Sequence, residues 1–236
     1  MFCLLGEPED RDILWLAAAL ERRRIEVELV LPEELMIGST LTCRTDDHAI
    51  GSSLRLHDGR TMDPYGPELV INRMVDLPPI GGTTSAADAR YLGEEWRAAV
   101  AAWLRTLRCP MLNPPRAASL SGPTFSPAAW RAIASAHGLA CRTWSSNQEA
   151  TAAHCTELVC VGTDTVDPSG VAPPAVRTAL AEMARFVGAP LLGATFDRSD
   201  NGWMFLEATP RPRLSCSGEE LVGALTDFAR LQREPA

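Results

Sequence analysis

Short apolar runs and a helical repeat alternate at the start of the chain. Residues 2–6 form an apolar run, and a second run that is rich in β-branched residues follows at 27–31. Between them, in residues 10–24, apolar positions recur every three or four residues, which is the spacing of one buried helix face. This order predicts a βαβ unit, in which a helix crosses over between two parallel strands.

The turn after the first run argues against a dinucleotide site. Residues 6–10 read Gly-Glu-Pro-Glu-Asp, with one glycine and three carboxylates. A pyrophosphate at that turn requires a glycine-rich loop with free backbone amides, and here it would meet negative charge instead.

The pattern up to residue 115 predicts further strands and one long helix. Residues 52–63 favour a hairpin with its turn at Asp58-Gly59, and residues 40–48 favour an edge ribbon, which is a usual place for a peptide to bind. A buried strand is expected at 69–72 and a helix with an apolar stripe at 85–107. A short strand closed by Pro114 and Pro115 then marks a domain boundary.

The second part of the chain mixes strands and helices. Ser126 and Pro127 predict the start of a helix that ends at Gly138, and further helices are expected at 174–187 and after a capping box at 217–220. Strands are expected at 139–143, 157–162, 191–197 and 203–207. The sequence therefore predicts an α/β protein with two domains, residues 1–115 and 116–236.

Composition excludes several classes of function. All 22 basic residues are arginine, so lysine chemistry such as Schiff-base formation and a P-loop is excluded. A net charge of -8 argues against a nucleic-acid partner. The chain has no apolar run of about 20 residues, the length that a membrane span requires, and its start lacks the basic region of a signal peptide. We expect a cytoplasmic protein.

The cysteines do not predict a metal site or a disulfide framework. Seven cysteines are spread along the chain without a CxxC pair. His154, Cys155 and Cys160 lie close in sequence, but their spacing fits no usual zinc pattern. We expect reduced thiols, several of them buried, and no bound metal.

Three segments follow one another in an informative order: residues 71–73, residues 111–115, and the helix that ends at 134–139 and continues into 142–147. Together they resemble the entry to an ATP-grasp ligase of the branch that modifies ribosomally made peptides, and the related glutamate-ligase-like proteins. Residues 192–210 are similar to the metal-binding strand pair of the same family. The resemblance implies a Rossmann-like pre-ATP-grasp domain followed by a shortened ATP-grasp-like α+β domain.

The departures from the family pattern concern the metal ligands. Active members hold magnesium with two carboxylates and an asparagine on that strand pair, because hard cations require oxygen ligands. Glu207 matches the family's glutamate, but Thr195 and Thr209 take the places of the aspartate and the asparagine. Asp197 lies two residues from Thr195, on the same strand face, and is a candidate displaced ligand.

The phosphate-binding part of the family pattern is also reduced. No basic residue lies between Arg116 and Arg131, where the family's first lysine is expected. The second lysine and a glycine-rich loop would separate Asn147 from Glu157, yet this interval spans only ten positions. The resemblance therefore implies a protein that lacks most of the nucleotide-clamping lobe.

These observations leave three hypotheses open. The first is a non-catalytic, ATP-grasp-derived binding protein without a cofactor, which holds a peptide or a partner enzyme in natural product biosynthesis. The second is an ATP- and magnesium-dependent carboxylate–amine ligase in which arginines replace the lysines and Glu207 and Asp197 contact the cofactor. The third is an enzyme of another kind that uses His154, Cys155 or Glu207, although the neighbours His154 and Cys155 would point to opposite faces of a strand.

Four arginines are the candidate binding residues under the first hypothesis. Arg211 and Arg213 alternate with prolines that stiffen the segment, so both guanidinium groups can face an acidic peptide or a phosphate. Alternatively, these arginines pair with the protein's own acidic residues. Arg73 and Arg116 are further candidates on the same cleft. The partner is a peptide, a modifying enzyme or a second copy of the chain.

Overall fold

A computed structural model describes residues 1–36, 38–45, 50–79, 85–141, 155–199 and 202–232. The chain separates into two units, Met1–Gly122 and Pro123–Ala236, and each unit has its own hydrophobic core. Residues 116–122, which the sequence analysis assigned to the second domain, lie in the first unit. The α/β class is confirmed, because one unit contains a parallel sheet and the other an antiparallel sheet, each packed with helices.

The first unit is built on a four-stranded parallel sheet with the order β2-β1-β6-β7. Its strands are β1 (Phe2–Leu5), β2 (Val27–Val30), β6 (Leu69–Asn72) and β7 (Met111–Leu112). Helix α1 (Arg11–Arg22) connects β1 to β2, which confirms the predicted βαβ unit. Strands β1 and β6 are buried along their whole length, as is usual for a parallel sheet covered on both faces.

A small antiparallel sheet and a long helix complete the first unit. The sheet contains β3 (Thr40–Thr45), β4 (Ile50–Arg55) and β5 (Thr61–Met62), and α2 (Pro32–Met36) precedes it. Gly59 has a φ of +90° in the turn between β4 and β5, so the predicted hairpin is confirmed. Helix α3 (Ala86–Thr106) packs on β4 and contributes Trp103 to the core.

The predicted edge ribbon is present in part. Residues 40–45 form β3, the outer strand of the small sheet, and residues 46–48 lie outside the described part of the chain.

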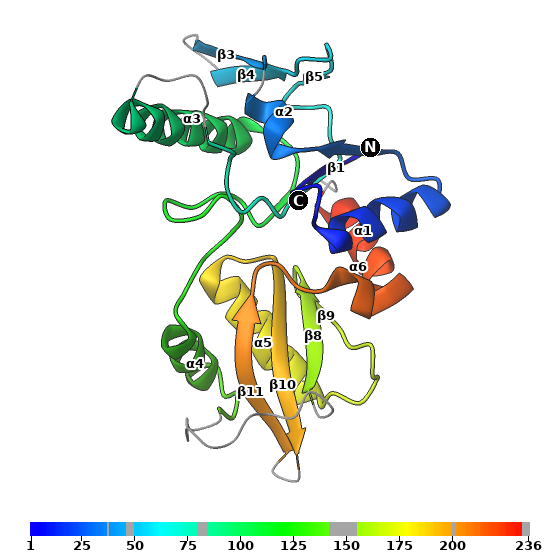
Figure 1. Ribbon diagram of the computed structural model, residues 1–236. Helices are drawn as coiled ribbons and strands as arrows, with labels where there is room; N and C mark the ends of the chain where they lie inside the picture. Colours follow the sequence, from blue (N-terminus) through cyan, green and yellow to red (C-terminus); the bar gives the residue numbers. More distant parts are fainter. Residues whose placement is uncertain (37, 46–49, 80–84, 142–154, 200–201, 233–236) are drawn as a thin grey trace. The chain divides into compact units, whose positions relative to one another are not determined.

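The second unit is a four-stranded antiparallel sheet with the order β11-β10-β8-β9 (Figure 1). Its strands are β8 (Cys155–Val161), β9 (Asp164–Val166), β10 (Leu191–Ser199) and β11 (Gly202–Thr209). Helices α4 (Pro127–Ala136) and α5 (Pro174–Val187) pack on one face, and α6 (Gly218–Leu231) contacts β8 and β9. Strand β9 was not predicted, and of the strand predicted at 139–143 the described residues show one bridge, from Cys141 to Phe205.

The two helix starts that the sequence predicted have different outcomes. Ser126 caps α4 as predicted, because its Oγ accepts a hydrogen bond of 3.3 Å from the backbone N–H of Ala129. The capping box at residues 217–220 is wrong. A short 3-10 helix (Leu214–Ser217) leads directly into α6, so Ser217 has a helical backbone and its side chain makes no capping bond.

A β-bulge shapes the hairpin of β10 and β11. The register shifts between Thr195 and Phe196, so that Thr195 is paired with Glu207 and Phe196 with Phe205. The bulge inserts one extra residue into β11, between Phe205 and Glu207. Without it, Phe205 and Ala208 would face opposite sides of the sheet, since they are three positions apart. With it, both belong to the core under α4 and α5.

No helix in the described ranges is long and apolar enough to cross a membrane.

Candidate functional site

A row of three polar side chains crosses the sheet of the second unit. Glu157 of β8 is paired with Thr195 of β10, and Thr195 is paired with Glu207 of β11. Leu158 and Ala194 lie beside them in sequence and belong to the core under α4 and α5. Side chains alternate between the two faces of a strand, so the row lies on the opposite face. Neighbouring strands are about 4.8 Å apart, which places the backbones of Glu157 and Glu207 about 10 Å apart.

Glu157 is the residue of this row that the sequence analysis missed. Its signal was available, because a carboxylate that alternates with Leu158 and Cys160 in a core strand must face the other side of the sheet. The sequence analysis considered Asp197 as the second carboxylate beside Glu207 and did not consider Glu157. A second carboxylate lies in the same row, on the far side of Thr195.

Arg213 holds the carboxylate of Glu157 through two hydrogen bonds. The guanidinium Nε donates to Oε2 over 3.0 Å, and the backbone N–H of Arg213 donates to Oε1 over 3.3 Å. The Glu157 side chain is 7% exposed, whereas that of Arg213 is 64% exposed. The predicted binding residue Arg213 thus fixes a buried acidic group, and most of its own side chain remains at the surface.

Gly193 makes room for this arrangement. A Cβ atom at Gly193 would lie 2.6 Å from Oε1 of Glu157 and 2.7 Å from Cβ of Pro212. Both distances are shorter than real contacts allow, so only glycine lets Glu157 and Pro212 pack directly on β10. The segment from Thr209 to Arg213 is consequently held against the sheet by an ion pair and by close packing.

The other predicted cofactor ligand, Asp197, lies on the same face as Thr195. It is 5% exposed, and its neighbours across the sheet are Cys155 and Met204. Its alternation with Phe196, which is in the core, fits the predicted orientation. Thr209, at the place of the family's asparagine, is half-buried at the end of β11, and its Oγ1 accepts a hydrogen bond of 3.1 Å from the backbone N–H of Arg211.

The four predicted binding arginines are divided between the two units. Arg211 and Arg213 belong to the second unit, and Arg73 and Arg116 belong to the first. Arg116 exchanges backbone hydrogen bonds with Ser119 in a short bridge. The binding roles of these arginines stay predictions.

Arg73 is engaged at the carboxyl end of the parallel sheet. Its side chain is 4% exposed and donates to both carboxylate oxygens of Asp10, which also caps α1. This is the edge at which open α/β sheets bind ligands, and here an internal carboxylate occupies the amide groups at the start of the helix.

Four of the described cysteines are poor nucleophiles. Burial raises the pKa of the Cys160 thiol to about 12, and burial also raises the pKa values of Cys3, Cys109 and Cys141. Such thiols hold little thiolate at neutral pH. His154, the base considered for Cys155, lies outside the described residues. In the described part of the chain, no three His, Cys, Asp or Glu side chains are grouped so as to hold a metal ion.

Comparison with solved structures shows that this chain shares the fold of ATP-grasp ligases. Macrocyclase MdnB from Microcystis aeruginosa MRC is 14% identical with a TM-score of 0.64, over 99% of this chain and 100% of that one. ATP-grasp ligase PsnB is 14% identical with a TM-score of 0.68, over 99% and 98%. A RiPP-associated ATP-grasp ligase from Chryseobacterium gregarium is 11% identical with a TM-score of 0.64, over 99% and 97%.

No protein-family model matches the chain, and no curated protein matches it. At the identities of the solved structures, the likeness establishes the fold, and the site residues must carry any statement about function.

The expectation of a protein without a cofactor is contradicted. PsnB was solved with Mg and ADP, and also with AMPPNP, and the Chryseobacterium gregarium ligase was solved with ADP. The expectation rested on the replaced metal ligands, on the absence of lysine and on the short interval from Asn147 to Glu157. The prediction that the chain is shortened in its nucleotide-clamping lobe stays a prediction.

The residues of the row fit a magnesium ion that arrives with a nucleotide. Magnesium is commonly bound through one or two carboxylates together with phosphate oxygens and water, without a complete cage of protein ligands. Glu207 is exposed and offers one carboxylate, and Glu157 offers a second if Arg213 releases it. The set is smaller than the three ligands that the resemblance implies for active members.

Proposed function

We propose that this protein binds ATP with Mg²⁺ and holds a peptide in a peptide-modification pathway, without joining the peptide itself. Two facts support the pathway: the fold is that of peptide-modifying ATP-grasp ligases, and the PsnB and Chryseobacterium gregarium structures contain precursor or leader and core peptides. One observation carries the non-catalytic assignment. Thr195 stands between two carboxylates of which one, Glu157, is held by Arg213.

The row assigns separate tasks to its members. Glu207 offers an exposed carboxylate at the middle of the hairpin, where it would contact the magnesium ion of a bound nucleotide. Bound Mg²⁺ supplies charge that screens the nucleotide's phosphates. Arg213 keeps Glu157 in a fixed position, and 64% of its own side chain is exposed. Together these residues support binding of a phosphate-bearing ligand over the sheet.

The same row argues against efficient phosphoryl transfer. That reaction depends on positioned metal charge and on cations around the transferring phosphoryl group. The chain has no lysine, and threonine replaces two of the three metal ligands that the resemblance implies. A neutral hydroxyl is a weaker ligand for a hard cation than a carboxylate. We therefore expect the protein to bind a nucleotide without transferring its phosphoryl group.

The second candidate is an ATP-dependent carboxylate–amine ligase. The position of Glu157 favours it, because release from Arg213 would bring two carboxylates of one row to face a nucleotide. Arginine also binds phosphate well, so Arg211 and Arg213 are suitable substitutes for lysine in binding. The two candidates differ in whether ATP is consumed.

Calorimetric titration with ADP and with AMPPNP, each with and without Mg²⁺, tests the proposal. We expect binding that requires Mg²⁺ and that Glu207→Gln abolishes. Glu220→Gln removes an exposed carboxylate at the start of α6 and should bind like the unaltered protein. Absence of binding at about 1 mM nucleotide would remove the nucleotide from the proposal.

Incubation with ATP, Mg²⁺ and a glutamate-rich peptide separates the two candidates. We expect no ADP above the level of a control without protein. If the unaltered protein forms ADP and the Glu207→Gln variant does not, the protein is a ligase and the non-catalytic assignment is wrong.

A further inference from the structure

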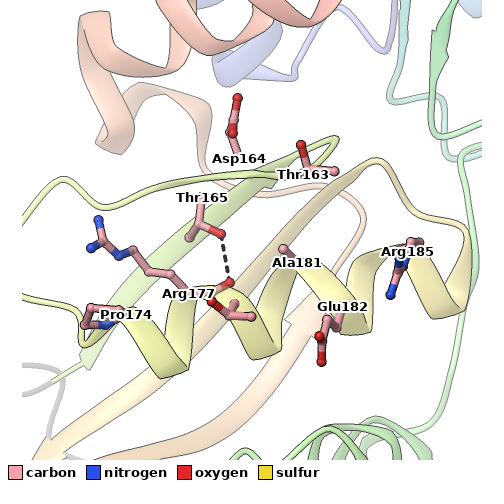
Figure 2. A pocket seen from close by; sticks show the side chains of 9 residues that line it. Thr163, Asp164, Thr165, Pro174, Arg177, Ala181, Glu182 and Arg185 are labelled. Atoms are coloured by element: carbon pink, nitrogen blue, oxygen red, sulfur yellow. Dashed lines mark hydrogen bonds between the residues drawn. The ribbon is translucent and has the colours of Figure 1, made fainter.

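A groove lies between the outer strand β9 and helix α5 in the second unit, and Figure 2 shows the side chains that line it. Its volume is about 660 Å³, within the range of about 300–1,000 Å³ that ligand sites occupy. Thr165 of β9 faces α5, since its Oγ1 donates a hydrogen bond of 3.2 Å to the carbonyl of Arg177. Thr165 is paired with the core residue Cys160, so the groove lies on the opposite face from the row of Glu157.

Strand β9 is an open edge in the described part of the unit. It is the last strand of the sheet, and no described strand pairs with its outer side. Two residues, Gly162 and Thr163, connect it to β8, and Gly162 has a φ of +63°. In a two-residue hairpin the pair that flanks the turn exchanges both hydrogen bonds, and the next pair turns its backbone groups outward. The N–H and C=O of Thr165 therefore face away from β8.

The helix side of the groove carries two arginines with no acidic partner of their own. Arg177 and Arg185 are both exposed, and neither forms an ion pair with any residue in the described ranges. They are eight positions apart, so they lie about 12 Å apart along α5.

The acidic residues of the groove point outward. In Figure 2 Asp164 is directed away from α5, and Glu182 is directed away from β9. The lining of the groove includes these two carboxylates at its border, together with two guanidinium groups, Thr165 and the small side chain of Ala181.

We infer that this groove binds an extended, acidic peptide segment, which adds to β9 as a further strand. The outward N–H and C=O of Thr165 would pair with its backbone. A strand rises about 3.3 Å per residue, so the distance between Arg177 and Arg185 spans three to four peptide residues. Carboxylate side chains at the two ends of that stretch would meet the two arginines. The inference rests on the proposed function, because the peptide is the partner that function requires.

Fluorescence anisotropy with a defined probe tests the groove. The probe is a fluorescein-labelled hexapeptide in which valine and glutamate alternate, and it is titrated with the full chain in the absence of nucleotide. We expect binding that the double substitution Arg177→Ala and Arg185→Ala weakens by about tenfold or more. Arg230→Ala removes an equally exposed arginine from α6 and should leave the affinity unchanged.

Two altered peptides test the two parts of the inference. A peptide with N-methyl groups on the backbone cannot donate a hydrogen bond to the Thr165 carbonyl and should bind at least about tenfold more weakly. A peptide with glutamine in place of glutamate should bind at least about tenfold more weakly. Equal binding of either peptide, equal binding by the double arginine variant, or no binding of the probe at about 1 mM would overturn the inference.

These experiments distinguish failure of the groove proposal from failure of the nucleotide-site proposal. Glu207 lies on the other face of the sheet from the groove. The Glu207→Gln variant should therefore bind the probe normally while losing Mg²⁺-dependent nucleotide binding. The double arginine variant should show the reverse behaviour, and its retained nucleotide binding would prove that it is folded. Loss of both activities in either variant would contradict the assignment of two separate sites.

Discussion

Arg73 donates two hydrogen bonds to Asp10, from Nε to Oδ2 over 2.7 Å and from Nη2 to Oδ1 over 3.2 Å. The Arg73 side chain is 4% exposed, and that of Asp10 is 12% exposed. The same carboxylate accepts from the backbone N–H groups of Asp12 and Ile13 at the start of α1. One side chain thus connects the end of β6 to the start of the first helix.

Replacement of Asp10 should destabilise the first unit strongly. Asp10→Asn keeps a good N-cap residue but removes the carboxylate charge that the buried guanidinium of Arg73 contacts at 2.7 Å. We expect a loss of about 3 kcal/mol in the free energy of unfolding, measured by urea denaturation. Asp12→Asn is the matched control, since Asp12 lies 3.9 Å from Arg73, and it should cost less than about 1 kcal/mol. Equal costs for the two variants would contradict the importance of the Asp10 pair.

The Asp10 pair should also make stability depend on pH in the acid range. Burial raises the pKa of Asp10, but the hydrogen bond and the charge of Arg73, together with the amides of α1, outweigh it and lower this pKa below 3.8. A carboxyl whose folded pKa is lowered stabilises the protein fully above its unfolded pKa and loses that contribution as the pH falls through the folded value.

Unfolding from about pH 6 down to about pH 2 measures this contribution. We expect the difference in unfolding free energy between the unaltered protein and Asp10→Asn to shrink below about pH 4. A difference that stays constant across the range would show that the ionisation of Asp10 is not responsible.

Gly193→Ala should disturb the row of Glu157, Thr195 and Glu207. The added Cβ would overlap Oε1 of Glu157 and Cβ of Pro212, so the segment after β11 must move. We expect a loss of about 1–3 kcal/mol in stability and weaker Mg²⁺-dependent nucleotide binding. Gly93→Ala is the control and should stabilise the protein by about 1 kcal/mol. Nothing lies within 4 Å of the added Cβ at that position in helix α3, and alanine favours helices over glycine.

Thiol alkylation should distinguish the cysteines by burial. Cys216 is exposed, whereas Cys3 and Cys160 are buried and their pKa values are raised by that burial, to about 12 for Cys160. Treatment with iodoacetamide at about pH 8 should modify Cys216 first and leave the two buried thiols intact in the folded protein. Mass spectrometry of the digested protein gives the extent at each site. Early modification of Cys160 would mean that the core of the second unit opens readily.

The sequence predicted the helices better than the site. Helices α3, α4 and α5 combine an apolar stripe with a clear start, such as Ser126 followed by Pro127, and these signals are local. Strand β9 has three residues, which is too short for a periodic pattern. The capping box failed because residues 214–217 were already coiled in a 3-10 helix, a feature that the four letters of the box do not encode.

The candidate site depends on pairing between distant strands. Glu207 was identified from a motif, and the orientation of Asp197 followed from the alternation of side chains along one strand. The position of Glu157 opposite Thr195 depends on the register of β8 and β10, and its contact with Arg213 joins residues 56 positions apart. A single sequence does not reveal that register. The bulge next to Thr195 also shifts the register between β10 and β11.

The two units occupy consecutive stretches of the chain, and this has a consequence for synthesis on the ribosome. The described residues of the core cluster around Trp103 all precede residue 122. The second unit differs, because the Phe228 ring of α6 packs against Gly162 in the hairpin of β8 and β9. Domains generally fold as units in the order in which they emerge. The hairpin, with the edge of β9, therefore stays incompletely packed until α6 has been made.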